Sequence, residues 1–332
     1  AENCSHNMHN LIPIRGAQAR DALAWSKYIG EARDLFGARA KLMFASHHWP
    51  RWGHDDVDEF LRKQRDMYRF IHDQTMRWAN HGETPTEIAE RVSLPSEFAN
   101  EAHTTGYYGH LAHNVKAVYQ RYLSWYDGNP ANLWRLPPTE LAARYVALAG
   151  GPDAAIAAAR SAYESGDYRW VAELAGHLVF ADPSHREARE LQADAFEQLG
   201  YQSESATFRN AYLTGAQELR HGHPPRRAAV RRGYLDAMTV DQLIDSIAVR
   251  LRSEDVDGRT WTINLELTDR AEIWRVELSN RAISASPFPA ASPDATVRLA
   301  HVALVEIASG ESTPDTLLNA GRLDLSGAPE AL

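Results

Sequence analysis

The sequence has 332 residues, of which 44% are hydrophobic and 24% charged, a composition typical of soluble globular proteins and a length that favours two or three domains. Its net charge of −9 excludes the basic footprint of a nucleic-acid-binding protein. Cys4 is the only cysteine, which excludes an intrachain disulfide and a cysteine-based zinc site. No apolar run reaches the length of about 18 residues that a membrane span needs, so we expect none.

The first ten residues, AENCSHNMHN, are dense in polar side chains and do not begin with methionine. We therefore expect the natural N-terminus to lie upstream, and the sequence leaves the cellular location open. A signal peptide upstream would make the protein periplasmic or secreted. Ten of the fifteen histidines fall at or before His113, which indicates that the chemistry lies in the first third of the chain.

Residues 1–56 are expected to be mixed α/β. Apolar residues at helical spacing predict a helix over 25–36, with Gly37 as its C-cap. The apolar run AKLMFA, residues 40–45, predicts a short buried strand, and the loop SHHWPRWG follows it. Because ligands in α/β folds collect beyond the carboxyl ends of strands, His47 and His48 occupy a favourable position for function.

Residues 57–220 are expected to be helical. An apolar face predicts a helix from Val57 to about Asn80, and aromatic residues near helical spacing, from Tyr108 onward, predict another within 104–130. Residues 138–215 resemble a tetratricopeptide-like array, with small residues recurring on the helix faces. Two such units bury too little surface alone, so we expect this region to form a homodimer.

Residues 221–235 are rich in arginine and proline and are interpreted as a solvated linker. Residues 236–332 are expected to be α+β, without a pair of acidic or histidine residues at catalytic spacing. Amphipathic and alternating patterns predict, in order, a helix over 240–251, strands near 261–267, 273–280, 281–286 and 295–300, two helices within 301–321, and a strand near 322–327.

Carboxylate and imidazole groups gather in the first 54 residues. Both are ligands that suit zinc, so a metal site is one hypothesis. Hydrogen-bonded loop histidines are the alternative, and spacing alone does not decide between the two. The candidates are Glu2, His6, His9, His47, His48 and His54.

Other polar groups favour an anionic ligand. Arg15 and Arg20 lie near Asn10, and a guanidinium group binds oxyanions through two parallel hydrogen bonds; surface arginines are the alternative. His110 and His113, among several tyrosines, suit a ligand pocket and a hydrogen-bonded core equally well. The chain has no phosphate-binding glycine loop, nucleophile elbow or H-E-x-x-H motif, which leaves nucleotide binding and serine hydrolysis without support.

Five long stretches carry a family resemblance: HNLIPIRGAQARDALAWSKYI, FASHHWPRWG, QRDMYRFIHDQTMRWANHG, GYYGHLAHNVKAVYQRYLSWYDGNPANL and FRNAYLTGAQELR. Together they resemble the alkylsulfatases of the metallo-β-lactamase superfamily, zinc hydrolases that cleave alkyl sulfate esters. The resemblance implies a multidomain chain. Its parts would be the end of a metallo-β-lactamase-like α/β domain (1–56), an α-helical dimerisation domain (57–220), a linker (221–235) and a sterol-carrier-protein-2-like α+β domain (236–332).

The resemblance also implies roles for single residues. Glu2 resembles the carboxylate that ligates or bridges two zinc ions, and His47 resembles a zinc-binding histidine. Asn10, Arg15 and His113 resemble groups that hold the sulfate. A hydroxide bound to zinc would then be the nucleophile.

Two assignments within the resemblance stay less specific. A tyrosine of the family also reaches the sulfate, and here Tyr119, Tyr122 and Tyr126 remain alternatives. His48 is assigned a structural or supporting role beside His47. The sequence does not decide whether primary or secondary alkyl sulfates are the substrates. It also does not decide whether the C–O or the S–O bond is cleaved.

The chain departs from the family in one respect. The H-x-H-x-D-H loop that supplies most zinc ligands is absent, as is a further upstream glutamate. Two zinc ions need about four ligands each, so we predict that the chain alone neither holds a stable dizinc centre nor hydrolyses alkyl sulfates. It would be the C-terminal part of a longer or nicked enzyme, or a truncated product. The rival hypothesis is a non-catalytic helical dimer with a lipid-binding-like module.

Overall fold

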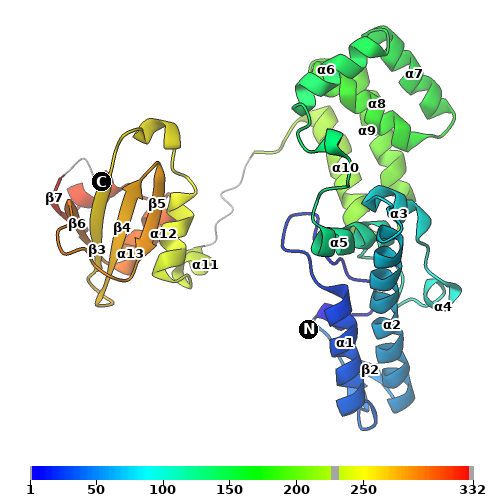
Figure 1. Ribbon diagram of the computed structural model, residues 1–332, viewed down its shortest axis with the longest axis horizontal. Helices are drawn as coiled ribbons and strands as arrows, with labels where there is room; N and C mark the ends of the chain where they lie inside the picture. The colour runs from blue at the N-terminus through cyan, green and yellow to red at the C-terminus, as the bar shows by residue number, and fades with distance from the viewer. Residues whose placement is uncertain (1, 226–231, 329–332) are drawn as a thin grey trace. The chain divides into compact units, whose positions relative to one another are not determined.

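The computed structural model describes residues 2–225 and 232–328. The chain divides into two compact units, Ala1–Pro224 and Pro225–Leu332, which we name unit 1 and unit 2 (Figure 1). The predicted domain boundary at residue 56 falls inside helix α2, which begins at His54. The residues on both sides of this boundary belong to unit 1. Within the described ranges, no helix is long and apolar enough to cross a membrane.

Unit 1 is mainly helical. Its elements, in chain order, are η1 (Glu2–Cys4), α1 (Ala22–Ala32), η2 (Arg33–Gly37), β1 (Leu42–Met43), β2 (Arg51–Trp52), α2 (His54–Ala79), α3 (Pro85–Arg91), α4 (Ser96–Ala99), α5 (Leu111–Leu123), η3 (Pro130–Asn132), α6 (Pro138–Leu148), α7 (Pro152–Glu164), α8 (Tyr168–Ala181), α9 (Arg186–Gln202) and α10 (Ala206–His221).

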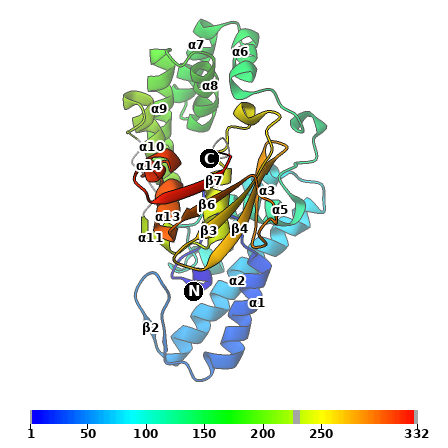
Figure 2. The ribbon, with the colours of Figure 1, turned by 90° about the vertical axis from the view of Figure 1, so that its left-hand side faces the viewer.

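Helices α1 and α2 lie side by side and form the first core of unit 1 (Figures 1 and 2). α1 begins after Asp21, whose carboxylate accepts a hydrogen bond from the amide of Ala24 and so caps the helix. The helical segment ends at Gly37, one residue later than predicted, so that Ala38 rather than Gly37 is its C-cap. α2 ends at the predicted position, next to Asn80, and buries Phe60 and Tyr68 completely.

The predicted buried strand at 40–45 is wrong. Only Leu42 and Met43 pair with another strand, β2, in a two-residue antiparallel hairpin. Leu42 is 48% exposed and Phe44 is 73% exposed. A short apolar run forms a buried strand only where a sheet covers both of its faces, and the described residues provide none here. Residues 2–56 therefore form helices and a short hairpin, and their assignment to a metallo-β-lactamase-like α/β domain stays a prediction.

The predicted aromatic helix is shorter than expected. α5 begins at Leu111, so Tyr108 is not helical. The amide of Gly109 donates a hydrogen bond to the carbonyl of Met8 at 2.8 Å. This pairing holds residues 106–110 against the N-terminal segment, and it takes the backbone hydrogen bonds that a longer helix would need.

Helices α7 to α10 pack one on the next. Small residues allow the helix axes to approach closely, as the sequence predicted. A Cβ atom at Gly176 would lie 2.9 Å from the Gln192 side chain, and one at Gly200 would lie 2.9 Å from Leu213. This packing agrees with the predicted helical region; the tetratricopeptide-like assignment stays a prediction.

Unit 2 is α+β, as predicted. Its five-stranded sheet has the order β5-β4-β3-β6-β7, in which β3 and β6 are parallel and the other neighbours antiparallel. Its elements are α11 (Arg232–Asp236), α12 (Val240–Ala248), η4 (Ser253–Val256), β3 (Trp261–Leu267), β4 (Glu272–Ser279), β5 (Ala282–Ser286), β6 (Ala295–Leu299), α13 (His301–Ser309), α14 (Pro314–Asn319) and β7 (Leu323–Gly327).

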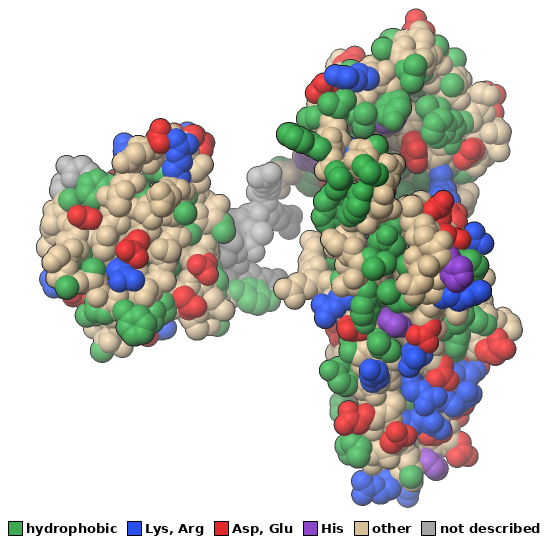
Figure 3. Space-filling view, viewed as in Figure 1, with side chains coloured by type: hydrophobic (Ala, Val, Ile, Leu, Met, Phe, Trp, Pro, Cys, Tyr) green, Lys and Arg blue, Asp and Glu red, His purple; other side chains and the backbone are tan. Residues whose placement is uncertain are grey.

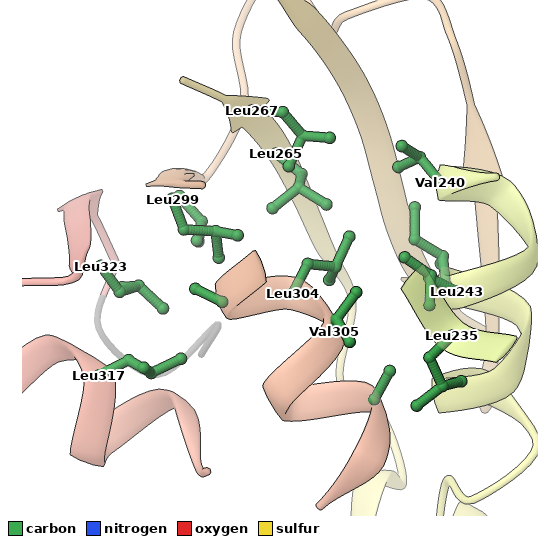
Figure 4. Close-up of a cluster of buried hydrophobic side chains, with 14 residues drawn as sticks. Leu235, Val240, Leu243, Leu265, Leu267, Leu299, Leu304, Val305, Leu317 and Leu323 are labelled. Atoms are coloured by element: carbon green, nitrogen blue, oxygen red, sulfur yellow. The ribbon is translucent and has the colours of Figure 1, made fainter. Parts of the chain in front are cut away.

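The core of unit 2 lies between the sheet and its helices. Figure 4 shows Leu265 of β3 and Leu299 of β6 facing Leu304 of α13 and Leu243 of α12. Leu235 of α11 belongs to the same cluster and is buried. The predicted linker therefore extends too far, because its last residue is anchored in this core. Residues 226–231 of that linker lie outside the described residues.

Candidate functional site

The two predicted metal ligands lie in direct contact. His47 Nε2 donates a hydrogen bond to Glu2 Oε1 at 2.9 Å, although 45 residues separate them. This hydrogen bond lowers the pKa of the Glu2 carboxyl below its usual value, and His9 and Arg20 act in the same direction. The carboxylate is therefore ionised at neutral pH, the form that binds a metal ion.

His9 lies on the other side of the Glu2 carboxylate. Its Nε2 atom is 3.5 Å from Glu2 Oε2, and its Nδ1 atom donates to the carbonyl of Asn10 at 2.9 Å. Burial is the main cause that lowers the pKa of His9. Its imidazole is therefore neutral at pH 7, and the Asn10 carbonyl fixes its orientation.

Arg20 connects the carboxylate to the backbone of the N-terminal segment. Its Nη1 atom donates to the Asn10 carbonyl at 2.7 Å, and its Nη2 atom lies 3.9 Å from Glu2 Oε2. Arg20 was an anion-binding candidate from sequence. The structure instead places it between the Glu2 carboxylate and the Asn10 carbonyl, which also accepts the hydrogen bond from His9.

A hollow of about 430 Å³ opens beside this cluster. His9 and His47 lie in its wall, and the Tyr108 ring packs against the His9 ring with centroids 4.9 Å apart. The lining residues are Ser5, Asn7, His9, His47, His48, Tyr107 and Tyr108.

The remaining candidate histidines have other surroundings. His48 accepts a hydrogen bond from Asn7 Nδ2 at 2.7 Å, and its φ of 66° turns the chain next to His47. His6 packs against Phe60 in a tilted arrangement, with ring centroids 4.7 Å apart. His54 is exposed at the first residue of α2. The structure thus brings Glu2, His9 and His47 together but leaves His54 apart.

Asn10 and Arg15, two of the predicted sulfate groups, line a second hollow of about 440 Å³. Arg15 is exposed there, and within residues 2–225 and 232–328 no hydrogen bond or ion pair holds its guanidinium group. Asn10 is buried, its Nδ2 atom donates to Thr207 Oγ1 at 3.1 Å, and its Oδ1 atom accepts from the His110 amide. Tyr108 lines both hollows.

His113, the third predicted sulfate group, lines neither hollow. Its Nε2 atom donates to the carbonyl of Ile12 at 2.6 Å. It therefore holds the backbone that leads from Asn10 to Arg15.

Asn114 is a supporting residue that sequence reasoning missed. Its Oδ1 atom accepts from the Leu11 amide at 2.8 Å and its Nδ2 atom donates to the His9 carbonyl at 2.9 Å. The only signal in the sequence was an amide side chain on the apolar face of α5, beside Val115 and Val118. Buried amides are usually hydrogen bonded to a partner, which here is the segment that carries the site.

None of the three alternative tyrosines lines either hollow. Tyr119 is buried in the core between α3 and α5, and Tyr122 donates to the Asp21 carboxylate at 2.8 Å. The tyrosines that line the hollows are Tyr107 and Tyr108, on the loop before α5.

Glu2, His9 and His47 carry carboxylate and imidazole groups, the types of side chain that zinc binds. His9 and His47 both lie near the Glu2 carboxylate. In the part of the chain that the structure describes, however, no group of three histidine, cysteine, aspartate or glutamate side chains is arranged to hold a metal ion. Because zinc usually takes four ligands, these side chains alone do not form a closed centre.

Two family models match the chain. The model described as alkyl sulfatase dimerisation matches residues 84–222, and the model described as alkyl sulfatase C-terminal matches residues 228–332. The class that the two matches define is the alkyl sulfatases, which are sulfuric ester hydrolases.

Relatives of known activity agree. A linear primary-alkylsulfatase of Pseudomonas sp is 46% identical over 98% of this chain and 49% of its own length. An alkyl/aryl-sulfatase of Saccharomyces cerevisiae is 44% identical over 98% of this chain and 51% of its own length. The chain belongs to the alkylsulfatase family, and it spans about half the length of these relatives.

Solved structures give the same result. The stereoselective inverting sec-alkylsulfatase Pisa1 from Pseudomonas sp. matches with a TM-score of 0.94 and 42% identity, over 100% of this chain and 52% of that chain. A sterol carrier protein 2 like 2 structure from Aedes aegypti matches 28% of the chain at 26% identity, but its TM-score of 0.23 is too low to support an argument.

Proposed function

We propose that this chain is the C-terminal portion of a zinc-dependent alkylsulfatase of the metallo-β-lactamase superfamily, which hydrolyses alkyl sulfate esters to alcohol and sulfate. The observation that carries the proposal is the contact of Glu2 with His47 beside His9. A second hollow, lined by the exposed Arg15, adjoins it across Tyr108. Metal ligands next to an oxyanion-binding group are what hydrolysis of a sulfate ester requires.

In this proposal Glu2 and His47 contribute two ligands to a two-zinc centre, and residues outside this sequence complete it. Bound zinc would supply a water molecule with a pKa near neutrality. Residues 1–56 would then be the end of the metallo-β-lactamase-like domain. Arg20 would keep the Glu2 carboxylate in place, together with the Asn10 carbonyl that orients the His9 imidazole.

Arg15 is the proposed contact to the sulfate, because its exposed guanidinium can form two parallel hydrogen bonds to oxyanion oxygens. Asn10 lines the same hollow, and a sulfate oxygen there would replace Thr207 as the acceptor for its Nδ2 atom. His113 holds the Ile12 carbonyl and so fixes the turn that carries Arg15.

The test compares the purified chain with the chain joined to the segment encoded upstream of it. Zinc content and hydrolysis of dodecyl sulfate are measured for both. We expect turnover only with the upstream segment, and we expect its loss in Glu2→Gln and His47→Ala. Turnover by the chain alone would refute the need for further ligands, whereas a longer protein with neither zinc nor hydrolysis would refute the function.

A homodimer is part of the proposal, because residues 84–222 match the alkyl sulfatase dimerisation model. Light scattering at micromolar concentration tests it: a mass near twice 37.1 kDa is expected.

The rival function is a non-catalytic helical dimer whose second module is similar to sterol carrier protein 2 and binds lipid. The observation in its favour is a cavity of about 160 Å³ in unit 2, lined only by apolar side chains such as Ile263, Val276 and Ile307. If the longer protein shows neither zinc nor hydrolysis but unit 2 binds a fatty acid, the rival replaces the enzyme.

A further inference from the structure

Between helices α5 and α6 the chain forms an exposed segment, residues 124–137, which we name the strap. Four large apolar side chains project from it into solvent. Trp134 is 96% exposed and Trp125 is 64% exposed, and Leu133 and Leu136 are also exposed. Figure 3 shows hydrophobic side chains on the surface of unit 1 where Figure 1 places the connection from α5 to α6. Apolar groups gathered in this way on a surface mark an interaction site.

The strap has a defined conformation. The Asp127 carboxylate accepts hydrogen bonds from the Asn129 amide at 3.0 Å and from Asn132 Nδ2 at 2.5 Å. Asn129 in turn caps η3 by accepting from the Ala131 amide at 3.1 Å. A segment that is already ordered loses little conformational entropy on binding. The strap is therefore suited to docking as it stands.

Size and charge favour a second copy of this chain as the partner. Two tryptophans and two leucines would bury on the order of 500 Å² per copy, so a symmetric pair would reach about the 1,000 Å² that a specific interface needs. The strap carries one acidic and one basic residue, Asp127 and Arg135, so two straps do not repel, although the chain has a net charge of −9. It also lies within the residues that match the dimerisation model.

We propose that the strap forms the interface between two copies of this chain, with Trp134 at its centre. The proposal rests on the homodimer in the proposed function and adds the surface and the residue that hold it together. Tryptophans that become fully desolvated commonly carry most of the affinity of an interface.

The experiment is light scattering of the full chain and of Trp134→Glu, with far-ultraviolet circular dichroism to verify folding. We expect the wild type to be a dimer and the variant to associate at least tenfold more weakly. Trp49→Glu is the matched control: it makes the same change at an exposed tryptophan in the hairpin of unit 1, outside the strap, and it should keep the dimer.

A second measurement does not depend on the variants. Hydrogen exchange of residues 124–137 should slow as the protein concentration rises through the dimerisation range. A dimer that persists in Trp134→Glu, with unchanged exchange in the strap, would overturn the assignment of the surface but leave the homodimer intact. A monomeric wild type would overturn both. Neither outcome bears on zinc binding or hydrolysis, which are tested separately.

Discussion

His47 Nε2 lies 2.9 Å from Glu2 Oε1, and this contact closes a segment of 45 residues. The hairpin of β1 and β2 carries His47, and the N-terminal 3-10 turn carries Glu2. Because the carboxylate is also near His9 and Arg20, its position is set by three groups.

The contact predicts that zinc binding depends on the charge of Glu2. In the protein that includes the upstream segment, Glu2→Gln should weaken zinc binding by more than about tenfold, because a neutral amide is a poorer ligand and the His47 hydrogen bond loses its charge. Competition with a chelating dye measures this. Glu31→Gln, at an exposed position on α1, should bind zinc like the wild type; equal affinities of all three proteins would contradict the assignment.

Arg20 is predicted to stabilise unit 1. Replacing it by Met removes a charged hydrogen bond to the Asn10 carbonyl and should lower the free energy of unfolding by about 1.5–3 kcal/mol. Urea unfolding gives the value. Arg39→Met is the control, because Arg39 donates to the Leu35 carbonyl from an exposed position. If it lowers the free energy of unfolding as much as Arg20→Met does, burial is not the cause.

Acid should destabilise the fold through His103. Burial, the main cause, lowers its pKa to about 4, so the folded state keeps the imidazole neutral while the unfolded chain takes up a proton near pH 6.5. Stability is then full above about pH 6.5 and falls as the pH drops toward 4, by about 2 kcal/mol between pH 7 and pH 5. Urea unfolding at both pH values measures the difference.

The control for this pH dependence is His103→Gln, which cannot take up the proton. Burial also lowers the pKa of His6, His9 and His110, so the variant should retain a smaller dependence rather than none. An identical pH dependence in the variant and the wild type would rule out His103 as a contributor.

Gly109→Ala should displace the N-terminal segment. Its Cβ would lie 2.6 Å from the Met8 carbonyl oxygen and 2.9 Å from the His9 carbonyl carbon, both rigid backbone atoms. We expect a loss of more than about 2 kcal/mol in unfolding free energy, together with weaker zinc binding in the longer protein. At Gly233, no atom of the described residues lies within 4 Å of an added Cβ, so Gly233→Ala should change stability little. A similar loss at both sites would mean that the close approach to Met8 is not responsible.

Periodicity in the sequence was sufficient for most of the regular elements. The apolar face from Val57 gave α2, and the alternation ending in Leu265 and Leu267 gave β3, because each pattern matches the geometry of one local element. The apolar run at 40–45 predicted a buried strand because apolar residues are usually buried. This prediction was wrong, since the described residues leave Phe44 exposed.

By itself the sequence determined which chemistry is available: a carboxylate, several histidines and arginines in the first third, and no cysteine ligand set. Only the tertiary structure decided that Glu2, His9 and His47 meet, that Arg15 lines a hollow as an exposed side chain, and that Asn114 supports the segment. The reason is physical. Patterns along the chain encode local geometry, whereas a site depends on contacts between residues far apart in sequence, and those contacts arise only when distant elements pack together.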